Sequence, residues 1–476
     1  MLSRISNFAK KMMEVFNTPN KVIITCNRRL SPYLAQEVEA LGFRIVRSFN
    51  TGVEVEASVN ECVRLNVNLR VASQVLYELK SFRARNADEL YKALLGVAWE
   101  DLLPFDGYFS VTSNVHNETI TTPLFANVKV KDAIVDRIKD KKGLRPNTGP
   151  ALDGAVVHLH WIDDRAEIFI DTSGETLAKH GYRKLPGKAP MLEALASATI
   201  MASGWDGKSP FVNPMCGSGT LAIEAALMAQ NRVPGLQRMN YAFMHLIGYN
   251  EEVFFEERRR LKEQTDKQNL PAIVASDISD MAIDIARANA KTAGVEHLIT
   301  FEVGDFAQTT IPEGKGVIMF NPEYGERLGV HTKLEATYKR MGDFLKQACK
   351  GYRGYIFTGN LELAKKIGLQ ASRRFEFFNG KLECRLLQYE LYEGSREHPT
   401  RPRPERPVEQ AAQAEIKPVS VEKPEQRQES KAVRPRFTEQ ARRDDGFDRR
   451  AEAADEEIKP TGNKIKKLVR RPRRDD

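Results

Sequence analysis

Cysteine is scarce in this sequence, and long apolar runs are absent. The five cysteines form no CxxC pair, and their spacing fits neither a zinc site nor a disulfide framework. Residues 1–20 lack the unbroken apolar core of a signal peptide, and no later segment reaches the length of a membrane span. We therefore expect a soluble cytoplasmic protein with reduced thiols and no membrane partner.

A large charge excess is also missing. Lys and Arg number 72 against 64 Asp and Glu, and the segment from Arg396 onward supplies five of the eight net positive charges. The rest of the chain is only mildly basic, which suits a polyanionic partner without proving one. With 476 residues, of which 41% are hydrophobic, the chain is long enough for two or three domains.

Short strands and helices alternate in the front half. An apolar strand from residue 21 and a helix from about residue 31 indicate a small α+β unit. Apolar residues at helical spacing then predict a helix from about 61 to 98. An amphipathic pattern predicts another helix over 129–143, ending in a basic cluster and a glycine.

After residue 210, strands alternate with longer helices, which is typical of a parallel, doubly wound sheet that binds its ligand at the carboxyl ends of its strands. The pattern predicts a helical insertion over residues 231–270 and a glycine-turned hairpin over residues 375–392 that closes the sheet. Beyond Glu393, Pro, Arg, Glu and Gln predict a disordered tail. Its end, Lys464–Arg474, carries seven basic residues, which commonly add salt-sensitive affinity for nucleic acid.

The first chemically informative loop is Asn213–Thr220, between a strand and a helix. Gly217 and Gly219 let the backbone turn sharply and approach a ligand, while the helix start offers unpaired N–H groups. The loop contains neither GxGxxG nor the GKS or GKT of a phosphate-binding loop, which disfavours a pyrophosphate ligand. Taken alone, it also fits a tight turn with no ligand.

Two acidic residues follow the next two strands. Asp277 can accept hydrogen bonds from both hydroxyls of a ribose. Asp305 can accept one from an adenine amino group, with Phe306 available for stacking. Either aspartate, considered singly, also fits a helix cap. Three such loops at one sheet edge favour a nucleoside site.

The decisive motif is Asn321-Pro-Glu-Tyr324, at a further strand end. An exocyclic amine conjugated to a base is a poor nucleophile, so an enzyme must hold its hydrogens with acceptors and aim its electrons at the methyl group. The Asn321 amide oxygen and the Pro322 carbonyl can be those acceptors. Tyr324 can stack on a base that has swung out of its helix or loop. An ordinary Asn-Pro turn is the alternative for the isolated tetrapeptide.

Together, NPMCGSGTLAIEAA, ASDI, GDF and NPEYGERLG resemble the motifs of the THUMP-domain RNA methyltransferases, especially the bacterial enzymes that methylate guanine N2 in large-subunit ribosomal RNA. The resemblance covers roughly residues 21–392 and includes HGYRKLPGKAPMLEALASA, which is similar to the family's lead-in to the cofactor site. The resemblance implies an α/β fold with a Rossmann-like class I methyltransferase domain. This domain has a mostly parallel doubly wound sheet and a C-terminal antiparallel hairpin, and α+β ferredoxin-like and THUMP domains precede it. The implied division is an N-terminal extension (1–20), a ferredoxin-like segment (21–65), a THUMP RNA-binding domain (66–173), a methyltransferase domain (174–393) and a disordered charged tail (394–476).

The resemblance also implies partners and site residues. The methyl donor is S-adenosylmethionine, no metal takes part, and the substrate is ribosomal RNA, with 23S first. Catalysis is assigned to Asn321, Pro322 and Tyr324. Cofactor binding is assigned to Asn213, Pro214, Cys216, Gly217, Gly219, Thr220, Asp277, Ile278, Asp305 and Phe306, with Glu193 at the methionine end unless it lies on a solvated helix face. From their charge rather than from the resemblance, Arg183, Lys141, Lys142 and Lys188 are assigned to contacts with RNA phosphates, although charge runs also simply face water.

Two positions depart from the family pattern. The cofactor loop usually begins Asp-Pro and the catalytic loop usually reads Asn-Pro-Pro-Tyr, whereas this chain has Asn213 and Glu323. Asn213 removes a charge near the cofactor. Glu323 leaves the acceptors Asn321 and Pro322 in place, so we expect catalysis to be retained, with an altered base preference or a reduced activity left open.

Two other functions stay open. An adenine-N6 methyltransferase acting on DNA or RNA needs the same Asn-Pro acceptor pair, although the front half shows no helix-turn-helix or zinc module for reading DNA. A non-catalytic RNA-binding factor for ribosome assembly would keep the fold without the reaction, and Asn213 and Glu323 motivate that reading. An NAD-dependent dehydrogenase is excluded because nothing in its chemistry calls for Asn-Pro-x-Tyr. The residues do not indicate an oligomeric state.

Overall fold

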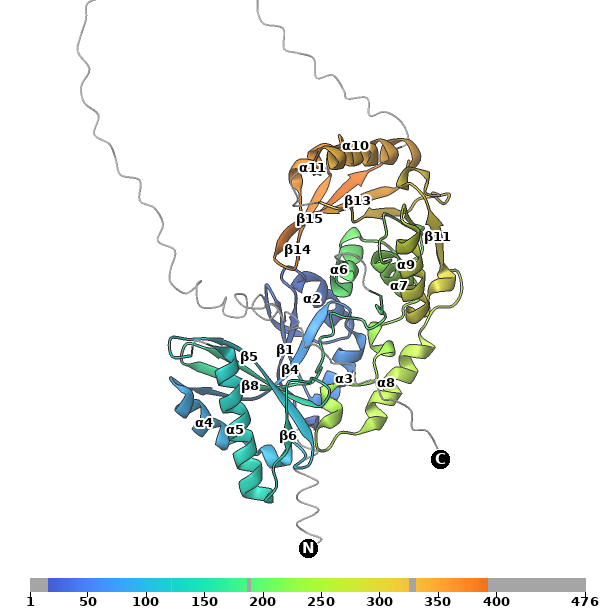
Figure 1. Cartoon of the computed structure of the whole chain (residues 1–476). Helices are drawn as coiled ribbons and strands as arrows, with labels where there is room; N and C mark the ends of the chain where they lie inside the picture. Colours follow the sequence, from blue (N-terminus) through green and yellow to red (C-terminus); the bar gives the residue numbers. More distant parts are fainter. Residues whose placement is uncertain (1–15, 121, 186–189, 325–330, 393–476) are drawn as a thin grey trace, which may run out of the picture.

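The computed structural model describes residues 16–120, 122–185, 190–324 and 331–392. The predicted tail, residues 394–476, lies outside these ranges. The described residues form two sheets, one in the lower part of Figure 1 and one in the upper part. No helix among them is long and apolar enough to span a membrane.

The first sheet has eight strands in the order β2-β3-β1-β4-β8-β7-β5-β6. Its strands are β1 (Asn20–Cys26), β2 (Ile45–Phe49), β3 (Gly52–Ala57), β4 (Ala72–Arg83), β5 (Tyr108–His116), β6 (Asn147–Thr148), β7 (Ala155–Ile162) and β8 (Arg165–Asp171). Its helices are α2 (Ser31–Ala40), α3 (Val59–Asn68), α4 (Ala87–Leu95) and α5 (Pro123–Lys142). Strand β4 pairs with β1 on one side and β8 on the other, so the two front units share one sheet. The boundary predicted between residues 65 and 66 lies inside α3, and the division stays a proposal.

The single helix predicted from about residue 61 to 98 is wrong in its middle. Helices α3 and α4 occupy its two ends, but β4 lies between them. Val75, Leu76 and Tyr77 of β4 are all buried, because this central strand is covered on both faces. Its apolar residues therefore do not alternate, and such a run cannot be told from a buried helix by its periodicity. The predicted helix over 129–143 is confirmed by α5, which ends at a left-handed Gly143 with φ 76°.

The second sheet has seven strands in the order β11-β10-β9-β12-β13-β15-β14. They are β9 (Phe211–Pro214), β10 (Ile273–Asp277), β11 (Ile299–Val303), β12 (Val317–Phe320), β13 (Arg353–Thr358), β14 (Arg373–Asn379) and β15 (Leu382–Glu390). The first five in sheet order are parallel, and β15 and β14 are antiparallel. The helices are α6 (Glu193–Ser203), α7 (Thr220–Ala229), α9 (Asp280–Ala293), α10 (His331–Ala348) and α11 (Leu361–Lys365). The predicted doubly wound sheet and closing hairpin are confirmed.

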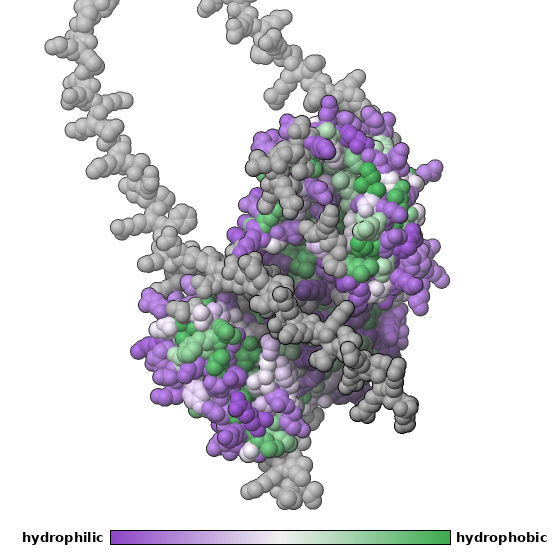
Figure 2. Space-filling view, viewed as in Figure 1, coloured by the Kyte–Doolittle hydropathy of each residue, from purple (hydrophilic) through white to green (hydrophobic). Residues whose placement is uncertain are grey.

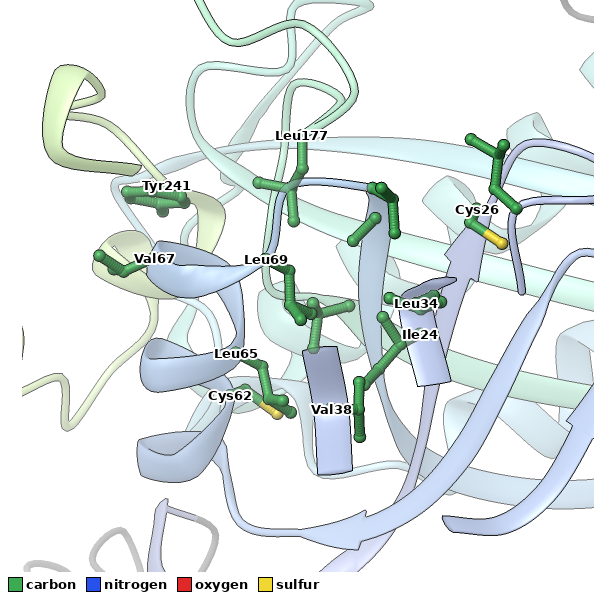
Figure 3. Packing of buried hydrophobic residues seen from close by; sticks show 14 of the residues in the cluster. Ile24, Cys26, Leu34, Val38, Cys62, Leu65, Val67, Leu69, Leu177 and Tyr241 are labelled. Carbon is green, nitrogen blue, oxygen red and sulfur yellow. The ribbon is translucent and has the colours of Figure 1, made fainter. Parts of the chain in front are cut away.

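The predicted insertion connects the two halves. It contains the short helices η2 (Pro234–Gln237) and η3 (Ala242–His245) and the longer α8 (Glu251–Glu263). Gly235 packs so closely on α3 that a Cβ there would lie 2.2 Å from the Val67 carbonyl oxygen. Ile247 N donates to Leu102 O at 2.9 Å. Figure 3 shows Val67 beside Tyr241 of the insertion, within one hydrophobic cluster.

Polar side chains dominate the visible surface of both halves, with smaller apolar patches between them (Figure 2). The core beneath this surface is apolar and runs from the first sheet into the second without a break. All five cysteines are unpaired, and four of them are buried.

Candidate active site

Parallel pairing brings four loops to one edge of the second sheet. Ala275 lies opposite Asn213 in the register of β10 and β9, and Asp277 lies opposite Val303 in that of β10 and β11. Strand β12 pairs with the other side of β9. The glycine-rich loop, Asp277, Asp305 and the Asn321 loop follow these four strands, so the predicted cofactor and catalytic residues share one edge.

The two glycines of the first loop have different environments. Both have positive φ, 54° at Gly217 and 80° at Gly219. A Cβ on Gly219 would lie 2.8 Å from the Ala286 Cβ, because the start of α7 packs closely on α9. A Cβ on Gly217 would meet no described atom within 4 Å. Gly219 therefore serves helix packing, whereas Gly217 faces open space that a ligand can use.

Backbone contacts hold this loop to β10. Cys216 N donates to Ser276 O at 2.9 Å, and Gly217 N donates to Asp277 Oδ2 at 3.0 Å. Burial raises the pKa of the Cys216 thiol, so the thiol stays protonated and cannot act as a nucleophile. Pro214 and Thr220 are buried at the two ends of the loop.

Asn213 has a structural function. Its side chain is 1% exposed, and Nδ2 donates to Met319 O of β12 at 2.9 Å. An ionised aspartate could not donate this bond. Asn213 Oδ1 is buried and has no hydrogen-bond partner among the described residues, so it remains an open acceptor at the sheet edge.

Asp277 and Ile278 combine polar and apolar contacts. The carboxylate of Asp277 accepts from Gly217 N and from Ser279 N, each at 3.0 Å. Each oxygen keeps a further acceptor position for a hydroxyl. The Ile278 side chain is 75% exposed, which is unusual for a large apolar residue and suits a flat ring lying against it.

Asp305 lies where it was predicted, but Phe306 does not have the predicted function. Asp305 Oδ1 accepts from Ala307 N at 2.9 Å and from Arg340 Nη2 at 2.7 Å. Burial opposes ionisation, but these bonds outweigh it and lower the pKa of Asp305. Phe306 is 6% exposed and packs against Phe320 in the core. The expectation that its ring is available for stacking is wrong, because the short helix after Asp305 turns that ring inward.

The catalytic loop offers an open acceptor. Asn321 Oδ1 is buried without a hydrogen-bond partner among the described residues. Pro322 is buried, whereas Glu323 is exposed. Burial raises the pKa of Tyr324 to about 12, so its ring is neutral near pH 7.

The closing hairpin and β13 fix the Tyr324 ring. Its hydroxyl accepts from Asn379 Nδ2 at 2.9 Å. A Cβ on Gly359 would lie 3.2 Å from Tyr324 Cδ2, so this glycine lets the ring lie close to the backbone. Tyr338 OH contacts Glu323 O at 3.4 Å and Thr358 Oγ1 at 3.0 Å. The loop is therefore held from two sides.

Arg183 and Glu193 lie beside the end of the glycine-rich loop. Arg183 Nη2 donates to Met191 O at 2.6 Å and to Thr220 Oγ1 at 3.0 Å. It lies 3.5 Å from Glu193 Oε2, and the Arg183 side chain is only 13% exposed. The predicted RNA contact of Arg183 is wrong, because its guanidinium points inward. Glu193 is 2% exposed, which excludes the solvated helix face.

Family models match three consecutive parts of the chain. They are the RlmL ferredoxin-like domain over residues 21–76, the THUMP domain over 84–171 and the RMKL-like methyltransferase domain over 180–388. The ribosomal RNA large subunit methyltransferase K/L of Syntrophotalea carbinolica is 35% identical over 387 residues, which are 79% of this chain and 54% of that protein. Its counterpart in Pseudomonas putida W619 is 33% identical over 78% of this chain and 52% of that protein. The chain thus spans about half the length of these curated relatives.

Two solved structures match the chain over nearly their full lengths. SMU.472, described as a putative methyltransferase and solved in complex with SAH, has a TM-score of 0.72 and 27% identity over 79% of this chain and 99% of its own. A protein of Listeria monocytogenes, described as a predicted N6-adenine-specific DNA methylase, has a TM-score of 0.71 and 30% identity over 79% and 97%.

The chain belongs to the THUMP-containing RlmL-like methyltransferases. The family resemblance read from the sequence and the expected fold, with ferredoxin-like and THUMP domains ahead of a class I methyltransferase domain, are thereby confirmed.

Sequence reasoning missed one buried group of this RlmL-like chain, His180 with Glu224. His180 Nδ1 lies 2.8 Å from Glu224 Oε1, and Nε2 lies 2.8 Å from Arg70 O. Both partners are acceptors, so both ring nitrogens carry protons and His180 is an imidazolium. Burial lowers the pKa of His180, but the charge and hydrogen bond of Glu224 outweigh it and raise the pKa. The signal was present in the sequence: Glu224 is the single acidic residue of the otherwise apolar α7.

The predicted RNA-binding lysines of the RlmL-like chain are not at the sheet edge. Lys141 and Lys142 are exposed in the last turn of α5, on the first sheet (Figure 1). Lys141 Nζ lies 3.1 Å from Asp140 Oδ2. Lys188 lies outside the described residues. RNA contact by the two described lysines stays a prediction.

Proposed function

We propose that this protein transfers a methyl group from S-adenosylmethionine to an exocyclic base nitrogen of RNA, guanine N2 of 23S ribosomal RNA in the first place. The observation that carries the proposal is the Asn321–Tyr324 loop, with an open acceptor at Asn321 Oδ1, on the same sheet edge as the glycine-rich loop. Relatives named ribosomal RNA large subunit methyltransferase K/L support the RNA substrate. The SAH-bound structure of SMU.472 supports the cofactor.

The cofactor edge fits an adenosyl group. S-adenosylmethionine, when bound, supplies a methyl group on a sulfonium. Asp277 faces the edge with acceptor positions for ribose hydroxyls, and Ile278 offers an exposed apolar surface beside it. Asp305 Oδ2 remains free of the bonds that Oδ1 makes and can accept from an adenine amino group. Gly217 leaves room for the ligand. The described residues contain no cluster of three or more His, Cys, Asp or Glu that could hold a metal.

The catalytic loop can direct the nucleophile. Asn321 Oδ1 and the Pro322 carbonyl accept the two N–H groups of the exocyclic amine, which aims the nitrogen lone pair at the methyl carbon. With the cofactor bound, the nitrogen would take the methyl group while the sulfur would keep the electron pair of the broken S–C bond, and the proton that the methylated amine loses would pass to solvent. Tyr324 stacks on the extruded base, and its neutral ring adds no charge there.

The two departures from the family do not disturb these groups. Asn213 donates to a carbonyl of β12 and so holds the strand that carries the catalytic loop. Glu323 uses its backbone carbonyl as a contact for Tyr338, and the residue as a whole is exposed. Neither residue replaces an acceptor of the target amine.

Adenine N6 is the second candidate target. The Listeria structure is described as a predicted N6-adenine-specific DNA methylase, and it is 30% identical to this chain. An adenine amino group would be held by the same Asn-Pro acceptors. The third reading, a non-catalytic RNA-binding factor, predicts no methyl transfer at all.

Nucleoside analysis separates these functions. The full chain is incubated with labelled S-adenosylmethionine and ribosomal RNA from cells that lack the protein, and in parallel with unmethylated DNA. We expect label in N2-methylguanosine from RNA. Label in N6-methyladenosine from either nucleic acid would move the target to the second candidate. Absence of label in both, together with no SAH binding, would overturn the enzymatic function.

A further inference from the structure

The last strand of the second sheet is held on both faces by the ferredoxin-like part of the chain. Strand β14 ends that sheet, next to β15, and Figure 1 shows the hairpin of these two strands reaching α2. Tyr33 of α2 stacks on Phe377, with ring centroids 5.7 Å apart. Arg29 Nη2 lies 3.1 Å from Glu376 Oε2. Because neighbouring residues of a strand point to opposite faces, these two contacts cover both faces of β14.

Arg28 makes a different contact at the tip of the hairpin. Its guanidinium carbon lies 4.4 Å from the centroid of the Phe378 ring, which is a cation–π contact. Arg28 is exposed, and Phe378 is half-buried. The planar guanidinium carries its N–H donors around its rim, in a fork that matches two oxygens of a phosphate. The ring therefore orients a group of the kind that binds phosphate.

The tip of the hairpin adjoins the catalytic loop. Asn379, the residue after Phe378, donates from Nδ2 to the Tyr324 hydroxyl at 2.9 Å. A base that stacks on Tyr324 stays joined to its ribose and to the flanking phosphates. The RNA backbone therefore has to pass the rim of the catalytic loop, and Arg28 lies at that rim.

The positive charge at the tip comes from the ferredoxin-like part. Residues 376–385 carry two acidic and two basic side chains and are neutral as a group. Within this group, Arg385 Nη2 lies 3.4 Å from Glu376 Oε1. Arg28 and Arg29 add two positive charges. A surplus of positive charge beside the catalytic loop attracts a polyanion such as RNA.

The turn that carries Arg28 is preformed. Arg29 has a left-handed φ of 69°, which residues other than glycine rarely adopt. Arg29 N donates to Asn50 O at 3.3 Å, and Leu30 N donates to Asn27 O at 3.0 Å. Such a backbone persists only where the surrounding structure holds it, and it is frequent at binding sites. A preformed turn also loses less entropy when a ligand binds.

We propose that Arg28 binds the RNA backbone beside the target nucleotide, with its guanidinium donating to a phosphate while the Phe378 ring holds it in place. This inference rests on the proposed function, because it presumes an RNA substrate whose base reaches Tyr324. The ferredoxin-like part then contributes a substrate contact at the site of methyl transfer.

Adjacent arginines allow a matched comparison. Arg28→Gln removes the charge, and Arg28→Lys keeps the charge but not the planar fork. Arg29→Gln is the control, because Arg29 is the next residue, carries the same charge and contacts Glu376. The full chain and each variant are assayed with ribosomal RNA from cells that lack the protein. The measurements are kcat and KM for this RNA, its dissociation constant over a series of salt concentrations, the dissociation constant of S-adenosylhomocysteine and the midpoint of urea denaturation.

A lost charge-assisted hydrogen bond corresponds to a loss of affinity of roughly tenfold. We expect Arg28→Gln to raise KM for RNA by about that factor, with kcat and the affinity for S-adenosylhomocysteine unchanged. The slope of log affinity against log salt concentration should fall by about 1, as for the loss of one phosphate contact. Arg28→Lys should restore the slope and part of the affinity. Arg29→Gln should lower the urea midpoint but keep the KM and the salt slope of wild type.

Two results would refute the inference while the proposed function stands. If Arg28→Gln and Arg29→Gln raise KM by the same factor, only the net charge of the turn matters. If Arg28→Gln lowers the urea midpoint but leaves the RNA affinity and its salt slope unchanged, Arg28 only holds the hairpin.

Failure of the proposed function is a separate outcome. A wild type that transfers no methyl group would overturn that function, and the RNA affinities and salt slopes would then decide the inference by themselves. If Arg28→Gln does not fold, Arg28→Lys and Phe378→Leu replace it. Both keep the charge and disturb the stacked guanidinium, so an unchanged RNA affinity in both variants would refute the inference.

Discussion

The two glycines of the cofactor loop provide the sharpest structural prediction. Both have positive φ, so an alanine at either position costs about 1–2 kcal/mol in backbone strain. At Gly219 the new Cβ would also lie 2.8 Å from the Ala286 Cβ, and overpacking typically adds about 1–3 kcal/mol. At Gly217 the Cβ meets no described atom within 4 Å. We expect Gly219→Ala to lower the free energy of unfolding by about 2–5 kcal/mol and Gly217→Ala by only about 1–2 kcal/mol.

Ligand binding should show the reverse order. The Cβ of Gly217→Ala projects into the space assigned to the cofactor, so S-adenosylhomocysteine should bind at least about tenfold more weakly, a loss of roughly 1.4 kcal/mol. Urea denaturation measures the first effect, and calorimetry at a temperature where both variants are folded measures the second. Equal losses of stability in the two variants, or unchanged binding in Gly217→Ala, would refute the reasoning.

Three further predictions concern the contact between the insertion and α3, the buried His180 and the ring of Tyr324. A Cβ on Gly235 would lie 2.2 Å from Val67 O, so Gly235→Ala should destabilise the chain by about 1–3 kcal/mol and speed proteolysis of the insertion. An unchanged midpoint of urea denaturation would contradict this prediction. The pKa of His180 is higher in the folded chain than in the unfolded chain, where it is about 6.5. Protonated His180 therefore contributes its full stabilisation below about pH 6.5, and this contribution is lost as the pH rises through the pKa of the folded chain. The stability advantage of wild type over His180→Gln should therefore shrink in denaturation series above about pH 6.5, and a growing advantage would show the opposite charge state. Tyr324→Phe should keep the rate of methyl transfer within about threefold of wild type. Tyr324→Ala should lower that rate roughly 10- to 100-fold, since stacking contributes about 1–3 kcal/mol per base. Equal losses in the two variants would assign the function to the hydroxyl group.

The sequence predicted the catalytic half well because its sheet is regular. Each parallel strand is a short apolar run followed by a loop with distinctive residues, so the residue pattern alone places Asp277 and the Asn321 loop at one edge. Strand β4 was missed because burial on both faces removes the alternation that identifies a strand. Local pattern cannot reveal how many neighbours a strand has.

The directions of the side chains were the second feature that could not be predicted from the sequence. Arg183 belongs to a segment with several basic residues, and only the fold shows that its guanidinium turns inward to Thr220. Phe306 follows a predicted ligand residue, yet its ring packs in the core. His180 and Glu224 lie 44 residues apart in the sequence, so their contact depends on tertiary packing. Residue type and spacing predicted which loops share the sheet edge, but not which side chains are buried away from it.

Single-turnover methyl transfer by Asn321→Ala tests the central claim most directly. The variant is compared with wild type on ribosomal RNA from cells that lack the protein, with S-adenosylhomocysteine affinity measured alongside. If Asn321 Oδ1 holds the target amine, the rate of methyl transfer should fall roughly 100- to 1,000-fold, which is the loss seen when one oriented hydrogen-bonding group is removed from an active site. The affinity for S-adenosylhomocysteine should stay unchanged. Wild-type transfer by Asn321→Ala, or a parallel loss of cofactor binding, would contradict the account.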